Sequence, residues 1–125
     1  IALSLNPYEK DVYFNLATFY LNQGRLNEAE AIVKKELVLY PDSANAYFNL
    51  GGVYLKQGKH EDAEKAWKKT LELNPRRARV RNNLGILYSQ KKLYEEAKNM
   101  FLGELSVNPD SQSARHNLQL LEELL

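Results

Sequence analysis

The amino-acid sequence predicts an all-α fold, an α-solenoid in which antiparallel pairs of helices stack one after another. The chain has four prolines, and each follows the previous one by 34 residues: Pro7, Pro41, Pro75 and Pro109. Residues 10–43 and 44–77 are identical at 15 of 34 aligned positions. A fixed period of this length is typical of repeat proteins, in which each unit buries its apolar surface against the next unit.

Each repeat is predicted to contain two helices, as residues 44–77 illustrate. Apolar and small residues recur there at i, i+3, i+4 and i+7: Tyr47, Leu50, Gly51 and Tyr54. A second stripe of the same kind consists of Ala63, Ala66, Trp67 and Leu71. Such spacing places each set on one side of a helix. Gly58 lies in the polar turn between the helices, where it can adopt the left-handed conformation, and Pro75 ends the second helix. The small residues Gly51 and Ala63 are expected to let the two helices approach closely.

The same register predicts the organisation of the chain. We expect one domain over residues 1–125, with full repeats at 10–43, 44–77 and 78–111, the end of a preceding repeat at 1–9 and a C-terminal capping helix at 112–125. The chain begins with Ile1 and not with Met, so we expect it to be a piece of a longer protein. In the last helix, Leu118, Leu121 and Leu125 form a stripe that would cover the end of the stack. Leu120 and Leu124 would belong to a continuing interface in a longer chain.

These residues resemble the tetratricopeptide repeat. That family has an aromatic residue, Leu-Gly, Tyr, Ala, an aromatic residue and Pro at the places of Tyr47, Leu50-Gly51, Tyr54, Ala63, Trp67 and Pro75. The resemblance implies a right-handed superhelix whose concave side is lined by the first helix of each pair. The departures are Ala17 at a usual glycine, Lys92 at the turn glycine, and Arg81 and Arg115 at the opening aromatic place. The RNA-reading pentatricopeptide repeat lacks this Leu-Gly and Ala pattern and is disfavoured.

One side of the first helices carries polar and small residues, and we call it the first-helix face. An asparagine marks it in every repeat: Asn15, Asn49, Asn83 and Asn117. Because an amide both donates and accepts hydrogen bonds, a ladder of asparagines would hold an extended peptide by its backbone. Similar ladders line the tetratricopeptide segment of O-linked N-acetylglucosamine transferase. The alternative is that these amides bond to a neighbouring helix. Further residues of the face are Phe14, Phe48, Lys56, Arg79, Asn82, Ile86, Gln90, His116 and Leu120.

Two parts of this face have a more specific interpretation. Phe14 and Phe48 would form an apolar wall of the groove, unless they pack against the adjacent repeat. Arg79 belongs to a stretch with four arginines between residues 76 and 81, and among them it alone shares the face with Asn82 and Asn83. The helix that begins there carries arginines against its dipole and lacks a serine cap. We therefore predict that Arg79, alone or together with Arg77, binds an acidic group of a ligand.

The carboxylate clamp of chaperone-binding relatives is not predicted. In those relatives the clamp has five residues. They are a lysine and an asparagine on one first helix, an asparagine on the next, and a lysine and an arginine on the third. In this chain Asn49 and Arg79 match, whereas Phe14, Thr18 and Asn83 occupy the other places. A ligand held only by its acidic C-terminus is therefore not expected.

Composition narrows the class of protein. The formal net charge is +1. The second helices carry lysines balanced by glutamates: Lys34, Lys35, Lys68 and Lys69 with Glu36, Glu64 and Glu72. This balance predicts a solvated mixed-charge face and no nucleic-acid binding. The sequence has no cysteine and two histidines on different repeats, and no phosphate loop or nucleophile motif. We expect no catalysis, no cofactor and no metal ion. No apolar run approaches membrane-spanning length.

The sequence therefore predicts a scaffold or adaptor that binds an extended or helical peptide segment of another protein in its concave groove. One alternative is a non-catalytic docking module of a larger enzyme, such as a glycosyltransferase. Another is self-association through an exposed end of the solenoid, which would give a homo-oligomer. The partner and the cellular compartment do not follow from the sequence.

Overall fold

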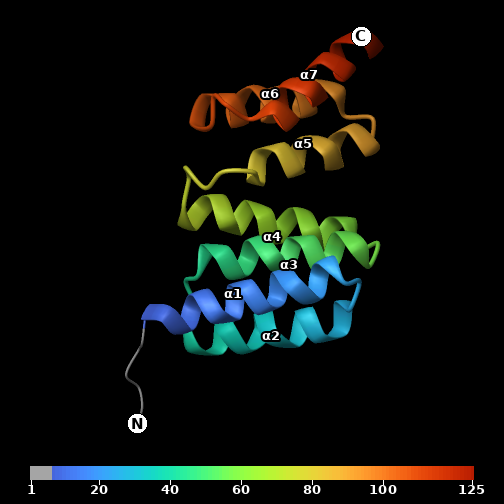
Figure 1. The fold of residues 1–125 in the computed structure, drawn as a ribbon. Coiled ribbons are helices and arrows are strands. Elements are labelled where there is room, and N and C mark those ends of the chain that lie inside the picture. Colours follow the sequence, from blue (N-terminus) through green and yellow to red (C-terminus); the bar gives the residue numbers. More distant parts are fainter. Residues whose placement is uncertain (1–6) are drawn as a thin grey trace. The chain divides into compact units, whose positions relative to one another are not determined.

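The computed structural model describes residues 7–125 and shows seven helices and no strand within that range (Figure 1). The helices are α1 (Pro7–Asn22), α2 (Leu26–Leu39), α3 (Ala44–Lys56), α4 (His60–Leu73), α5 (Val80–Gln90), α6 (Tyr94–Val107) and α7 (Gln112–Leu124). The predicted all-α helical repeat fold is confirmed. Across the described residues, none of the helices combines the length and the apolar character needed to span a bilayer.

The chain divides into two compact units, which we describe separately. Unit 1 is Ile1–Leu73 and contains α1 to α4, and unit 2 is Asn74–Leu125 and contains α5 to α7. The predicted repeats 44–77 and 78–111 each contain one helix pair, and α1 begins before residue 10, at Pro7. The predicted end of a preceding repeat spans residues 1–9, and residues 1–6 of it lie outside the part of the chain that the structure describes. The repeat boundaries, the single domain and the right-handed superhelix stay predictions.

In unit 1 the second helix pair packs on the first pair. Helix α3 contacts both α1 and α2. Two buried residues of α3, Ala46 and Leu50, join Ala17 and Val33 in one apolar cluster. A little further along, Val53 packs with apolar residues of α1 and α2 in a second cluster. The stripes predicted from the period are thus shared between successive pairs, because one pair alone cannot bury them.

The close approach predicted at Gly51 has a specific cause. A Cβ atom at residue 51 would overlap the indole ring of Trp67, and a Cβ atom at Gly85 would overlap the ring of Phe101. The Trp67 ring is held in place because its Nε1 donates a hydrogen bond to the Phe48 carbonyl at 3.1 Å. Glycine on the first helix therefore accommodates an aromatic ring from the second helix of the same pair. In the first pair, Ala17 accompanies the smaller Val33 at the corresponding places.

The turns inside the helix pairs need a residue with positive φ. Gly24 and Gly58 have φ of 77° and 79°, and Lys92, at the third such place, has φ of 64°. A residue with a Cβ atom adopts this conformation at a cost of about 1–2 kcal/mol. The turn is therefore formed in all three pairs, and the departure at Lys92 changes the strain and not the backbone path.

The mixed-charge face of the second helices is only partly as predicted. Lys34 pairs with Glu30 and Lys68 with Glu64, both at 2.8 Å. The expectation that Glu36 belongs to this solvated face was wrong, because Glu36 is only 1% exposed. Its Oε2 accepts a hydrogen bond from the Ser43 hydroxyl at 2.7 Å. Burial raises the pKa of Glu36, and the bond from Ser43 acts in the opposite direction.

Candidate functional site

In unit 1 the asparagine of the first-helix face bonds to the preceding first helix. Asn49 is 4% exposed, and its Nδ2 donates to the Phe14 carbonyl at 3.3 Å and to the Thr18 Oγ1 at 3.2 Å. The Thr18 hydroxyl in turn donates to the Phe14 carbonyl at 2.8 Å. The two bonds of Asn49 connect α3 to α1, and the Thr18 bond lies within α1. The Nδ2 group of Asn49 therefore bonds to a neighbouring helix, which is the alternative that the sequence left open.

Unit 2 repeats this contact with a different acceptor. The Nδ2 of Asn117 on α7 donates to the side-chain Oδ1 of Asn82 on α5 at 3.1 Å. In both units the acceptor residue lies 35 residues before the asparagine. Asn82 is buried, and its backbone N–H donates to Oε1 of Glu104 on α6 at 3.1 Å. A continuous set of hydrogen bonds thus joins α6, α5 and α7.

The buried carboxylate of Glu104 explains the unusual start of α5. Its Oε2 accepts a hydrogen bond from the backbone N–H of Arg79 at 2.8 Å, and Glu104 is completely buried. Arg79 is the N-cap residue, with a φ of 79° and no side-chain cap bond, whereas Ser43 and Ser111 cap α3 and α7 with their hydroxyl groups. The hydrogen-bond acceptor that this helix start lacks among its own side chains is supplied by α6. Sequence reasoning missed Glu104 because the carboxylate comes from another helix.

The arginines near this start differ in their surroundings. The Arg79 side chain is exposed, and Arg77 is half-buried. Burial and the neighbouring Arg79 lower the pKa of Arg77, and Glu104 opposes the shift. Arg81 is half-buried, and its stem lies against Gly103 of α6. The arginines that are close in sequence therefore differ in burial: Arg76 and Arg79 are exposed, and Arg77 and Arg81 are half-buried.

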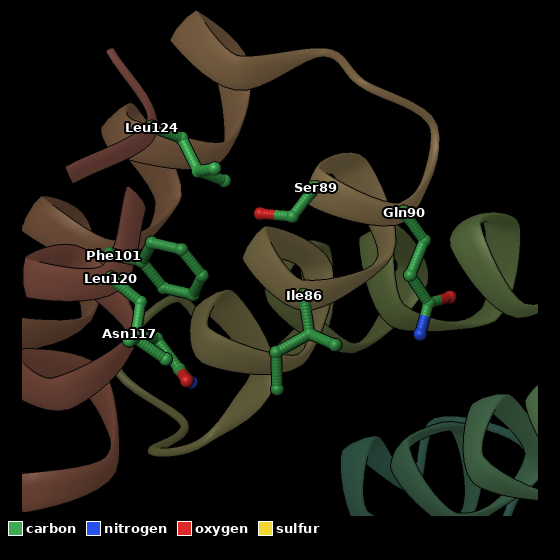
Figure 2. Close-up of a pocket in the computed structure, with 7 residues that line it drawn as sticks. All are labelled: Ile86, Ser89, Gln90, Phe101, Asn117, Leu120 and Leu124. Carbon is green, nitrogen blue, oxygen red and sulfur yellow. The ribbon is translucent and has the colours of Figure 1, made fainter. Parts of the chain in front are cut away.

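A pocket lies on the first-helix face of unit 2, and its volume is about 260 Å³. Figure 2 shows Phe101, Asn117 and Leu120 together on one side of it and Ile86 on the other. The lining residues come from three helices: Ile86, Ser89 and Gln90 from α5, Phe101 from α6, and Asn117, Leu120 and Leu124 from α7. Asn117 therefore takes part both in the bond to Asn82 and in the wall of the pocket. The residue that joins α7 to α5 is therefore also part of the candidate site.

The apolar character of this pocket follows from two positions of the repeat. At the position of Ile86, successive repeats carry Thr18, Gly52, Ile86 and Leu120. At the position of Leu124 they carry Asn22, Lys56, Gln90 and Leu124. Large apolar residues thus appear at these positions only in unit 2. The sequence already placed Ile86, Gln90 and Leu120 on the face, and comparing each position across the repeats would have shown that this end is apolar.

The other predicted site residues have varied surroundings. Asn15 on α1 and Lys56 at the end of α3 are exposed, and Asn83 on α5 is half-buried. Phe14 is half-buried, while Phe48 is 9% exposed. The structure brings Phe14 and Asn49 together, and likewise Asn82 and Asn117. Contact of any of these residues with a ligand stays a prediction. Among the described residues, no group of three acidic or histidine side chains is arranged to hold a metal ion.

Stacked helix pairs with a 34-residue period place the chain in the class of helical repeat proteins. The tetratricopeptide repeat model matches residues 9–76 and 42–102, which together cover most of the sequence. The chain therefore belongs to the tetratricopeptide repeat family. A search of the curated proteins finds no match.

Several solved structures have a similar fold. A structure of Pseudomonas aeruginosa pilF is 30% identical with a TM-score of 0.85, and the similarity covers 92% of this chain and 53% of that chain. This chain thus spans about half of the pilF chain. A MamA structure is 26% identical with a TM-score of 0.78, covering 94% of this chain and 64% of that one. The first tetratricopeptide domain of Spaghetti (RPAP3), bound to the HSP90 peptide SRMEEVD, is 20% identical with a TM-score of 0.84, and 98% of both chains are covered.

Replacing Glu104 by glutamine tests its role in positioning α5. A glutamine oxygen can accept only one of the two backbone bonds, and its NH2 group would face the other N–H donor. We expect Glu104→Gln to lower the free energy of unfolding by about 1–3 kcal/mol in a urea titration. Glu123→Gln, on an exposed residue of α7, is the control and should change it by less than about 0.5 kcal/mol. Equal urea midpoints for Glu104→Gln and the native chain would contradict the assignment.

Proposed function

We propose that this chain is a protein-interaction module, a scaffold that binds an extended or helical segment of another protein on its first-helix face. The observation that carries the proposal is the pocket of unit 2, which opens on this face and is lined mainly by apolar side chains. A concave apolar site with a few polar groups at its rim is the usual form of a binding site. Leu120 and Leu124 are large apolar residues that are 48% and 69% exposed. Binding a partner would remove this surface from water.

The relatives agree with this class of function. The RPAP3 domain is a complex with an HSP90 peptide, and the type III secretion chaperone SycD of Yersinia enterocolitica is a complex with a peptide of the translocator YopD. At 20% and 12% identity, these two share the fold of this chain, and their peptides do not identify its ligand. They support peptide binding as a use of this fold. We propose no catalytic role for the chain itself.

The predicted site residues keep a place in the proposal. Asn15 and Lys56 are exposed on the face, and Arg79 is exposed at its edge in unit 2. The Nδ2 groups of Asn49 and Asn117 bond to the preceding first helix, so any contact that they make with a backbone N–H of the ligand would use their Oδ1 atoms. Asn83, Phe14, Phe48 and Asn82 would then act mainly by shaping the surface on which the segment lies.

A selected peptide can test the proposal. Panning a phage-displayed library of random peptides, about a dozen residues long, against the native chain should enrich specific binders. We expect Leu120→Gln to weaken the binding of such a peptide about 10-fold in fluorescence anisotropy, because apolar contact area is lost. Leu102→Gln is the matched control, since Leu102 is 46% exposed on α6 and does not line the pocket. The proposal fails if no peptide is enriched, or if both variants bind as the native chain does.

A second candidate function, self-association, is favoured by the apolar face of α1. Val12 and Phe19 are 60% and 53% exposed, and their spacing of seven residues places them on one side of the helix. The residues at the same positions of later repeats are all buried: Ala46, Val53, Val80, Leu87, Ala114 and Leu121. This face has the composition of a stacking surface. The preceding repeat expected from residues 1–9 would cover it in a longer chain, and a second copy would cover it in the chain as given.

Light scattering over a dilution series tests this candidate. We expect the native chain to change from dimer to monomer on dilution, and Phe19→Ser to be monomeric at every concentration. The control is Val38→Ser, since Val38 is 80% exposed on α2 and should not affect the mass. A native chain that stays monomeric up to the highest concentration would reject self-association.

A further inference from the structure

The lining of the unit 2 pocket contains no charged residue. Its walls are Ile86, Phe101, Leu120 and Leu124, and its polar members are the neutral Ser89, Gln90 and Asn117. A charged side chain entering this space would lose its hydration without gaining an ion pair, which is strongly unfavourable. One N–H of the Asn117 Nδ2 group donates to Asn82, and the N–H that remains is a neutral donor and not a countercharge for a carboxylate. The uncharged lining therefore favours an uncharged ligand group.

The volume of the pocket limits the kind of ligand that it can hold. Its volume of about 260 Å³ lies just below the roughly 300–1,000 Å³ of small-molecule sites. One side of the pocket is open, since Leu120 and Leu124 are largely exposed. A pocket of this kind fits a side chain that projects from a longer segment better than a separate metabolite. The lining also contains Ser89 and Gln90, whose side chains can form hydrogen bonds with the backbone of that segment.

We propose that this pocket is a specificity site that takes one uncharged apolar side chain, such as leucine, from the partner segment. The inference rests on the proposed function and adds to it the chemistry of the anchor residue. The positions that carry Ile86, Leu120 and Leu124 hold Thr18, Gly52, Asn22 and Lys56 in unit 1, so unit 1 has no large apolar residue at these positions. The anchor distinguishes this chain from one that reads an acidic peptide end.

The experiment introduces a positive charge into the pocket and a negative charge into the peptide, separately and together. The probes are a peptide enriched on the native chain, the same peptide with its apolar anchor changed to alanine or aspartate, and the acidic peptide SRMEEVD. We expect about 10- to 100-fold weaker binding for the alanine and aspartate forms and no saturable binding of SRMEEVD. Leu120→Lys should weaken the binding of the original peptide and strengthen that of the aspartate form. Leu102→Lys, outside the pocket, should do neither.

The outcomes separate the two proposals. If peptides are enriched but aspartate at every apolar position leaves the affinity within twofold, the anchor inference fails while the proposed function stands. The same holds if SRMEEVD binds more tightly than the apolar peptide, or if Leu102→Lys has the effect expected of Leu120→Lys. If no peptide binds the native chain, the proposed function fails and the inference fails with it.

Discussion

Within each unit, a hydrogen bond from an asparagine amide to the preceding first helix ties successive first helices together: Asn49 is buried in unit 1, and Asn117 is half-buried in unit 2. In unit 1 it joins Asn49 to the Phe14 carbonyl and the Thr18 hydroxyl, and in unit 2 it joins Asn117 to Asn82. Phe14 and Asn82 each lie 35 residues before the donor asparagine, one repeat and one residue, and Thr18 lies 31 residues before Asn49. Because a buried amide without a partner costs about 1–3 kcal/mol, the bond favours one separation of the two helices. The regular spacing of the first helices within each unit depends on it.

The candidate site of unit 2 is a consequence of this constraint. Glu104 holds the start of α5 through the N–H groups of Arg79 and Asn82, and the Asn82 side chain then receives Asn117 of α7. With α5 and α7 joined in this way, Ile86 and Leu120 come to line one pocket. The apolar surface that would bind a partner is therefore supported by polar bonds beneath it. A site whose lining residues are held by packing and hydrogen bonds beneath them is suited to binding a ligand in one geometry.

The parts that the sequence predicted correctly depend on residues near one another or one repeat apart. The 34-residue period predicted the helix pairs, the positive φ at Gly58 and the close approach at Gly51. It also marked Asn49 and Asn117 as special, although it left open whether they face a ligand or a helix. Glu104 was not predicted, because it bonds to N–H groups 22 and 25 residues away, and the same place carries Glu36 in the first repeat but Thr70 in the second. The pocket required the relative placement of three helices, which no local pattern contains.

The most direct measurement of the central constraint is a double-mutant cycle on the Asn82–Asn117 pair. The free energy of unfolding would be measured in urea for the native chain, for Asn82→Ala, for Asn117→Ala and for the double variant. If the amide bond ties α7 to α5, the effects are not additive, and the coupling free energy is about 0.5–1.5 kcal/mol. Additive effects, with a coupling free energy near zero, would contradict the conclusion that this bond positions the helices and the pocket.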